Sequence, residues 1–320
     1  MTTSTIPTAG GPSFVTDGGM ETDLIFNHGV DLPEFAAFPL LDDAVGRQLL
    51  ASYYDGYAAI ALAHAAHLLL ESPTWRANPD WGMRVGYGPE DLRRINMDAI
   101  AMLHALGSRY AAGGLVGQAV SGMVGPCGDG YAVGSGVDPD EAAEYHAPQI
   151  AAFAEAGADL VTAYTLTDVG EAIGIVRAAR QHGLPVGISF TVETDGRLPG
   201  GSTVTAAVDA VDAVAAPDHY LLNCANPAHM ANGLIDPVDG AHTAWRRIIG
   251  VRVNASLQSH DELDEADTLD NGDLDQLRDA TDHLQTLCGG PFSVLGGCCG
   301  TDTTHVAALW SARGRPDAMG

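Results

Sequence analysis

Short apolar runs alternate along the chain with longer segments in which apolar residues recur every three or four positions. Most of the short runs are apolar throughout, which is typical of strands covered on both faces. The pattern therefore predicts eight buried strands, each followed by a helix. We expect the strands at Ser13–Gly18, His67–Ser72, Leu115–Val120, Asp159–Thr165, Pro185–Val192, His219–Asn223, Ile248–Asn254 and Phe292–Gly297.

The segments between the predicted strands have the period of amphipathic helices. After the fourth strand, the apolar residues fall at the i, i+3, i+4, i+7 spacing of one helix face. They are Val169, Ala172, Ile173, Val176 and Ala179. Asp168 and Glu171 are expected to cap the start of this helix. Two Ala-rich segments, Glu141–Gly157 and Thr203–Ala216, also predict helices.

Eight strand–helix units in 320 residues favour an α/β fold, a (β/α)8 TIM barrel that forms a single domain over residues 1–320. Long loops are expected after strand three, over 121–138, and after strand seven, over 256–275. The alternative is an open doubly wound sheet. Thr16–Glu21, after the first strand, lacks the G-x-G-x-x-G pattern that such dinucleotide-binding sheets carry.

The amino-acid composition excludes several classes of binding partner and of catalytic mechanism. The apolar fraction is 46%, which excludes wholesale disorder, and 41 acidic against 15 basic residues give a net charge of −26. This charge opposes binding to nucleic acid and to anionic membranes. All 15 basic residues are Arg, so Schiff-base, pyridoxal-phosphate and P-loop lysines are excluded.

Targeting and membrane-spanning patterns are absent from the sequence, and one loop is strongly acidic. The first residues lack a signal-peptide pattern, and no run of 18 apolar residues occurs, so we expect a cytoplasmic protein. Eight acidic residues lie between Asp261 and Asp275, including Asp267, without the ligand spacing of an EF-hand. This loop is expected to be a solvated lid. The oligomeric state is left open.

The cysteines carry the most specific chemical signal. An odd number in a chain of this kind argues against a disulfide framework. They are Cys127, Cys224, Cys288, Cys298 and Cys299. Cys298 and Cys299 are adjacent, and glycines on both sides free the backbone to turn both sulfurs toward one point.

Barrel geometry would bring three of these thiols together. Cys224 ends the sixth predicted strand, and the Cys298–Cys299 pair ends the eighth, so all three face the same mouth. Three protein ligands with one open position describe a catalytic zinc site. The alternative is that these cysteines are buried as small apolar residues, which we favour for Cys127 and Cys288.

Short motifs lie at the ends of the predicted strands. In chain order they are Thr16-Asp17-Gly18-Gly19 with Thr22 and Leu24, Pro73-Thr74-Trp75, Gly125-Pro126 with Gly128-Asp129, Ser189-Phe190-Thr191 with Asp195-Gly196, Asn223-Cys224, Asn254 with Ser256, and Gly296-Gly297-Cys298-Cys299-Gly300. Together and in this order they resemble the motifs of the homocysteine S-methyltransferase family, and the last motif is the most specific.

The resemblance implies a zinc-dependent enzyme with a (β/α)8 barrel. It implies that Cys224, Cys298 and Cys299 bind Zn²⁺, and that the loop with Asp17, Gly18 and Gly19 holds the amino acid part of homocysteine. Further side chains lie at predicted strand ends and therefore at the barrel mouth. They either bind substrate or have ordinary structural roles. Asn223 and Asn254 could bind substrate or cap strand ends, and Trp75 with Tyr131 could face a cationic methyl donor or simply pack.

Three thiolates suit methyl transfer to sulfur. A thiol with a pKa of ~8.5 is mostly protonated at neutral pH, and zinc removes that proton. Three cysteinates give the site a charge of 2 − 3 = −1, which keeps a bound substrate thiolate reactive without a general base. The expected reaction moves a methyl group from a sulfonium or quaternary ammonium donor to a zinc-bound thiol, with homocysteine giving methionine. The alternatives are another thiol acceptor, a non-catalytic zinc or redox-sensing barrel and, more weakly, a zinc hydrolase.

One position departs from the family that the chain resembles. Many members carry a Glu after strand four that holds the homocysteine amino group, and Tyr164 stands there in this chain. A phenol offers a weaker, uncharged hydrogen bond. We expect altered homocysteine recognition, with Tyr164 near the substrate or near the open metal position. Glu193 is the carboxylate expected to substitute, unless it is a solvated loop charge.

Overall fold

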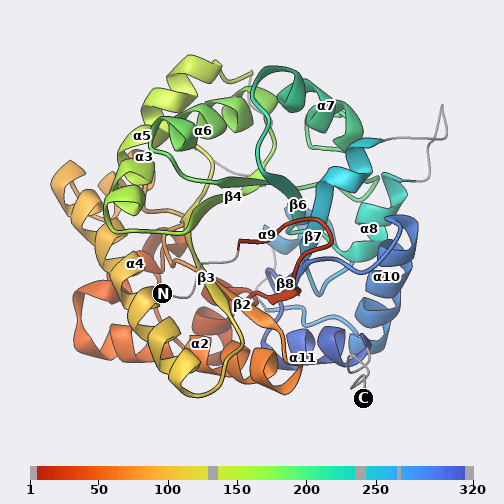
Figure 1. Cartoon of the computed structure of the whole chain (residues 1–320), viewed down its shortest axis with the longest axis horizontal. Coiled ribbons are helices and arrows are strands. Elements are labelled where there is room, and N and C mark those ends of the chain that lie inside the picture. The colour runs from red at the N-terminus through yellow and green to blue at the C-terminus, as the bar shows by residue number, and fades with distance from the viewer. Residues whose placement is uncertain (1–5, 129–135, 235–242, 265–267, 314–320) are drawn as a thin grey trace.

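The structure, a computed structural model, describes residues 6–128, 136–234, 243–264 and 268–313. Within these ranges eight parallel strands close into a barrel in the order of the sequence, which confirms the predicted TIM barrel (Figure 1). The strands are β1 (Phe14–Val15), β2 (His67–Glu71), β3 (Gln118–Val124), β4 (Leu160–Leu166), β5 (Val186–Phe190), β6 (His219–Asn223), β7 (Ile248–Val253) and β8 (Val294–Gly297).

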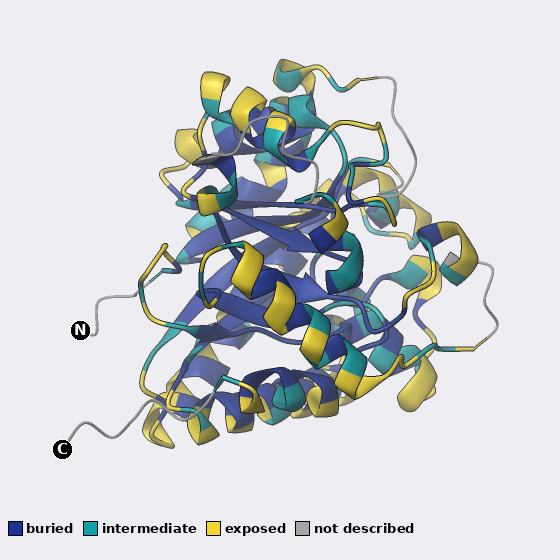
Figure 2. Cartoon of the chain, turned by 90° about the vertical axis from the view of Figure 1, so that its right-hand side faces the viewer, coloured by how far each residue is buried: buried dark blue, intermediate teal, exposed yellow. Residues whose placement is uncertain are grey.

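The barrel closes through its shortest strand. Phe14 of β1 pairs with His67 of β2 on one side and with Val294 of β8 on the other. Because all the strands are parallel, their carboxyl ends open at one end of the barrel, where TIM-barrel enzymes carry their active sites. Figure 2 shows the strands buried at the centre, while the helices bury one face and expose the other.

Helices follow the strands around the outside of the barrel. Five of the longer ones, α2, α5, α6, α10 and α11, begin after an Asp whose carboxylate accepts hydrogen bonds from first-turn N–H groups, so part of the acidic composition serves as helix caps. The helices are α1 (Met20–Thr22), α2 (Ala44–Ala63), α3 (Pro79–Arg84), α4 (Pro89–Ala112), α5 (Pro139–Glu155), α6 (Val169–Gln181), α7 (Val204–Val214), α8 (Pro227–Asn232), α9 (His260–Asp264), α10 (Leu274–Leu287) and α11 (Thr303–Ser311).

The third strand corrects the sequence prediction of Leu115–Val120. Leu115 instead closes the end of α4, where its N–H donates to the Tyr110 carbonyl after the left-handed Gly114. The strand then continues into the segment expected to be a loop, because Ser121–Val124 pair with Leu160–Ala163 of β4. Gly122 leaves room there for the Phe153 ring, which would lie 2.3 Å from a Cβ at this position. The loop after β3 therefore begins four residues later than predicted.

The cap of α6 is also only half as predicted. Asp168 accepts hydrogen bonds from the N–H groups of Gly170 and Glu171, as expected. The Glu171 carboxylate, however, turns inward and accepts from the Cys127 N–H at 2.6 Å and contacts His146 Nε2 at 2.9 Å. This buried carboxylate ties the loop after β3 to α5 and α6.

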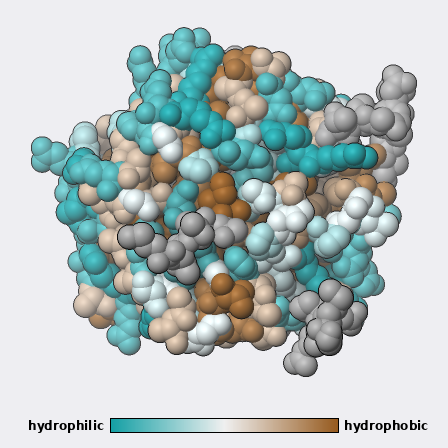
Figure 3. Space-filling view, viewed as in Figure 1, coloured by the Kyte–Doolittle hydropathy of each residue, from teal (hydrophilic) through white to brown (hydrophobic). Residues whose placement is uncertain are grey.

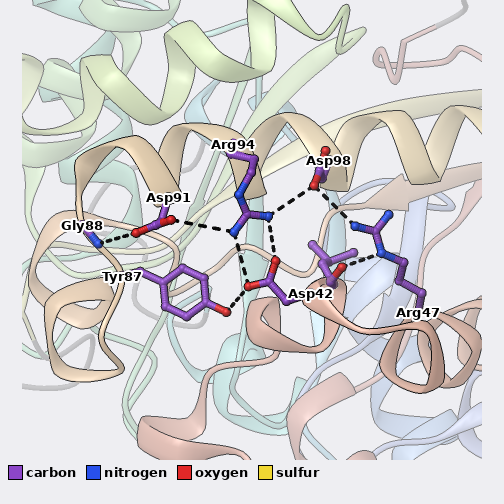
Figure 4. Close-up of polar contacts among 8 residues, drawn as sticks. Asp42, Arg47, Tyr87, Gly88, Asp91, Arg94 and Asp98 are labelled. Carbon is purple, nitrogen blue, oxygen red and sulfur yellow. Dashed lines mark hydrogen bonds and ion pairs between the residues drawn. The ribbon is translucent and has the colours of Figure 1, made fainter.

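A surface network joins the start of α2 to α4 (Figure 4). The Asp42 carboxylate accepts hydrogen bonds from Arg94 at 2.6 Å and from the Tyr87 hydroxyl. Asp98, one turn after Arg94, accepts from Arg94 and from Arg47 of α2. Each of these side chains is partly exposed, so each pair contributes at most about 1 kcal/mol.

The surface is mixed in character. Figure 3 shows hydrophilic residues around the rim, with separate apolar patches near the centre and the lower edge of the view. Among the described helices, none has the length and apolarity to span a membrane. The acidic loop after β7 is anchored rather than purely solvated, because the Ser256 hydroxyl donates to Asp270 at 2.6 Å. Asp267 lies outside the described residues.

Candidate metal centre and acceptor pocket

The three cysteines expected to converge do so at the carboxyl ends of β6 and β8. The Sγ atoms of Cys224, Cys298 and Cys299 all lie within 4.8 Å of one another, and those of Cys224 and Cys299 are 3.7 Å apart. Two sulfurs bound tetrahedrally to one zinc at ~2.3 Å are about 3.8 Å apart. The donor set and its spacing therefore fit a zinc ion with three thiolate ligands.

An uncommon backbone conformation presents the first of these sulfurs. Cys224 has a φ of 58°, which non-glycine residues rarely adopt. Its carbonyl oxygen accepts hydrogen bonds from Asn254 Nδ2 at 3.0 Å and from His260 Nε2 at 2.6 Å. Its N–H donates to the Arg252 carbonyl at 3.1 Å. These three hydrogen bonds hold Cys224 in its strained conformation. Asn254 therefore helps to position Cys224.

Glycines let the loop after β1 approach the cysteine loop. A Cβ on Gly19 would lie 2.5 Å from the Cys298 carbonyl oxygen, and one on Gly18 would lie 2.7 Å from the Thr301 carbonyl oxygen. Gly300 has a φ of 76°, so it supplies the left-handed turn after Cys299. Gly18 and Gly19 thus shape the site through close backbone packing.

The crowded thiols resist ionisation on their own. Hydrogen bonding to Cys224, together with burial, raises the pKa of Cys298 to about 12. Hydrogen bonding to Cys224 and to Cys298, together with burial, raises the pKa of Cys299. A bound metal cation would reverse this preference, because coordination deprotonates a thiol outright. Among the described residues, this is the one group of at least three Cys, His, Asp or Glu side chains spaced to hold a metal ion.

Asn223 connects the cluster to the neighbouring strands. Its Oδ1 accepts from the Thr165 N–H and the Ser189 hydroxyl, and its Nδ2 donates to Thr165 Oγ1 and approaches Cys298 Sγ at 3.9 Å. The Asn223 amide therefore mainly links β4, β5 and β6, and its Nδ2 also lies next to the Cys298 thiol. Cys127 lies apart from the cluster, with its N–H bonded to Glu171, and Cys288 is the C-cap of α10.

A small pocket of about 60 Å³ lies beside the cysteines. Its walls include the β1 loop, the ends of β4 and β6, and both Cys298 and Cys299. Within it, Asp17 forms a buried ion pair with Arg252, 2.6 Å apart. Arg252 also donates to the carbonyls of Gly18 and Gly297. The Asp17 carboxylate is therefore already neutralised by the protein itself.

Tyr164 lines this pocket but does not turn its hydroxyl toward the cysteines. The hydroxyl donates to Glu71 Oε1 at 2.7 Å, and the Arg252 guanidinium lies 4.9 Å from the ring centre. The expectation that this phenol approaches the open metal position is therefore wrong. Burial raises the pKa of Glu71 to about 7, and its Oε2 is buried without a hydrogen-bond partner.

Glu193 does not replace the carboxylate missing at residue 164. It lies 3.3 Å from His260 Nδ1, and both line a separate small hollow with His229. Glu193 does not line the small pocket beside Cys298 and Cys299, so the expected contact with a substrate amino group gains no support from the structure. Its place next to His260 connects it instead to the carbonyl of Cys224.

A wider cavity of about 370 Å³ adjoins the same cysteine cluster. It shares Thr22, Phe35, Trp75 and Cys299 with the smaller pocket. Trp75 thus lies between the two spaces, although its indole N–H is directed to the Tyr164 carbonyl at 3.4 Å. Tyr131, its expected aromatic companion, lies outside the described residues. A larger hollow of about 680 Å³ opens at the amino ends of the strands, where TIM-barrel active sites do not lie.

Three charged residues of this region were missed from the sequence. Arg252 and Glu71 occupy strands that are otherwise apolar, which is itself a signal, since a charge buried in a parallel strand needs a partner. Glu21 follows the β1 loop and lines the small pocket. Burial raises the pKa of Glu21 to about 7.

Comparison with known proteins agrees with this geometry. A family model described as homocysteine S-methyltransferase matches residues 14–312. A methionine synthase from Mycobacterium leprae (strain TN) is 32% identical over an alignment of length 175 that covers 50% of this chain and 13% of that protein. The chain thus spans only a small part of that relative's length.

Solved structures share the fold. The metallated form of the homocysteine methyltransferase MmuM from Escherichia coli superposes with a TM-score of 0.71 at 19% identity, covering 94% of this chain and 96% of that one. The apo form of the same enzyme gives a TM-score of 0.64 at 19% identity, covering 95% and 96%. From the match over residues 14–312, the chain belongs to the homocysteine S-methyltransferase family of enzymes.

Proposed function

We propose that this chain transfers a methyl group from a sulfonium or quaternary ammonium donor to a thiol, using Zn²⁺ held by Cys224, Cys298 and Cys299. The observation that carries the proposal is the convergence of three thiols at the barrel mouth, within 4.8 Å of one another. Family membership supports the reaction class, and the thiol spacing supports the metal.

Zinc, when bound, supplies the positive charge that keeps the acceptor sulfur deprotonated. The protein supplies the remainder. Hydrogen bonds to the Cys224 carbonyl fix one ligand, and the glycine-rich loop packed on Cys298 fixes the others. The acceptor sulfur attacks the methyl carbon in line, the bond from that carbon to the donor breaks, and its electron pair stays on the donor, which loses its positive charge.

Two adjoining spaces suit the two substrates of this reaction. The pocket of about 60 Å³ beside Cys298 and Cys299 fits the end of a small acceptor, and the cavity of about 370 Å³ leaves room for a donor. Trp75, which lines both, lies where an aromatic face could contact a cationic methyl group. Alignment of the two substrates is worth several kcal/mol of the barrier in such displacements.

Homocysteine, giving methionine, is the acceptor proposed first. A different thiol is the second candidate, because residue 164 is a Tyr whose hydroxyl is committed to Glu71. The test is an anaerobic assay that crosses homocysteine and other small thiols with S-methylmethionine, S-adenosylmethionine and betaine on zinc-loaded protein. Formation of a methyl thioether supports the proposal, and its absence from every combination contradicts it.

A further inference from the structure

The charged side chains that line the proposed acceptor pocket differ in how many hydrogen bonds and ion pairs they already form with the protein. Asp17 and Arg252 form an ion pair at 2.6 Å, and both have further partners. The Asp17 carboxylate also accepts from the hydroxyls of Thr16 and Tyr53, and Arg252 donates to two carbonyls. Neither group can turn to a ligand without leaving a buried charge unpaired, which is costly.

Tyr164 is similarly committed. It is 2% exposed, and its hydroxyl donates to Glu71 at 2.7 Å, on the side of the barrel core. Glu71 is itself completely buried and does not line the pocket. The β4 side of the pocket therefore offers a ligand no ionised side chain.

Glu21 differs from all of these. It is half-buried in the turn of α1, and it lines the pocket together with Cys298 and Cys299. Among the described residues that line the pocket, it is the carboxylate not held in an ion pair with Arg252. A cation bound next to it would gain a charge-assisted hydrogen bond.

We propose that Glu21 binds the amino group of the acceptor thiol and thereby selects thiols that carry an ammonium group near the sulfur. This inference rests on the proposed function, since it takes the pocket beside the cysteines as the acceptor site. It assigns to the β1 side of the pocket the recognition that residue 164 on β4 does not provide. Thiols without an amino group lack this contact and gain nothing from Glu21.

The test compares homocysteine with 4-mercaptobutanoate, which differs from it only in lacking the amino group. Zinc-loaded natural protein and Glu21→Gln are titrated with each thiol by calorimetry, and kcat/KM is measured with one fixed donor. Glu90→Gln, on the exposed first turn of α4, is the matched control for loss of one negative charge. Zinc content is measured for every protein.

The proposal predicts that Glu21→Gln weakens homocysteine binding about 10- to 100-fold and lowers its kcat/KM by a similar factor. Binding of 4-mercaptobutanoate and the zinc content should change less than about twofold, and Glu90→Gln should match the natural protein. Equal losses for both thiols, or no loss for homocysteine, would overturn the role of Glu21. Because calorimetry needs no turnover, selective binding without any methyl transfer would contradict the proposed function while supporting this inference.

Discussion

Glu71 offers a direct test of the buried charged groups around Arg252 and Tyr164. Its carboxyl group is completely buried, one oxygen accepts from Tyr164, and the other has no partner. Replacing it with Gln keeps the volume and an acceptor for the Tyr164 hydroxyl but removes the ionisable group. The variant therefore isolates the cost of burying a carboxylate here.

The magnitude follows from the pKa of Glu71. Burial raises this pKa from 4.5 to about 7, against the attraction of Arg252 and the hydrogen bond from Tyr164. The folded protein therefore holds the proton more tightly than the unfolded chain does. Stability from this group is fully present below pH 4.5 and is lost as the pH rises toward 7. The gap between the two pKa values corresponds to ~3 kcal/mol at pH 8.

The assay is the free energy of unfolding by urea, measured at pH 5 and pH 8 on reduced, metal-free protein. The difference in unfolding free energy between Glu71→Gln and the natural protein should shift in favour of the variant from pH 5 to pH 8. The shift should reach at most ~3 kcal/mol. Glu90→Gln, with an exposed side chain, should follow the natural protein at both pH values. A difference between Glu71→Gln and the natural protein that does not change with pH would refute the reasoning.

Three further predictions concern the metal centre and its neighbours. Cys298→Ala should lose zinc and activity together while circular dichroism stays unchanged, whereas Cys288→Ala should keep its zinc; full zinc in Cys298→Ala by elemental analysis would exclude that ligand. Millimolar hydrogen peroxide should release zinc and stop turnover, with partial recovery under thiol and zinc, because thiolates at the mouth are open to oxidation; unchanged turnover would contradict this. Tyr164→Phe should lower the unfolding free energy by about 1–3 kcal/mol, since Glu71 loses its donor, and a change within error would show that this hydrogen bond contributes little.

The structure also changes what a carboxylate at residue 164 would do. By the family resemblance, many members carry a Glu at this position that holds the homocysteine amino group. In the structure, that carboxylate would lie next to Glu71, which Tyr164 contacts at 2.7 Å. Two buried carboxylates repel each other, so one would stay protonated and the substitution would destabilise the barrel.

Strand order and the cysteine cluster were predictable because local sequence marks the strand ends, and a closed parallel barrel brings all of these ends to one mouth. The predicted strand His219–Asn223 has Tyr220, Leu221 and Leu222 at its centre and is followed by Cys224, and the observed β6 has these same bounds. The end of β3 was not predictable, because Ser121 and Gly122 are residue types common in loops, and only their pairing with Leu160 and Val161 of β4 makes them part of the strand. Tertiary contact, rather than propensity, decides such positions.

The inner charge arrangement could not be predicted for a similar reason. Asp17 and Arg252 are 235 residues apart in the chain, and only the closed barrel brings them to 2.6 Å. The direction of the Tyr164 hydroxyl depends on Glu71, which lies on a strand two places away in the barrel. A motif marks which residues reach the mouth, but their mutual hydrogen bonds decide which of them can meet a ligand.

The central claim is that three cysteinates hold a zinc ion whose fourth position accepts the substrate thiol. X-ray absorption at the zinc edge tests it most directly, on zinc-loaded protein with and without homocysteine and without a methyl donor. The account predicts three sulfur neighbours and one lighter atom before the thiol is added, and four sulfurs at ~2.3 Å afterwards. Fewer than three sulfurs at rest, or no gain of sulfur with the thiol, would contradict it.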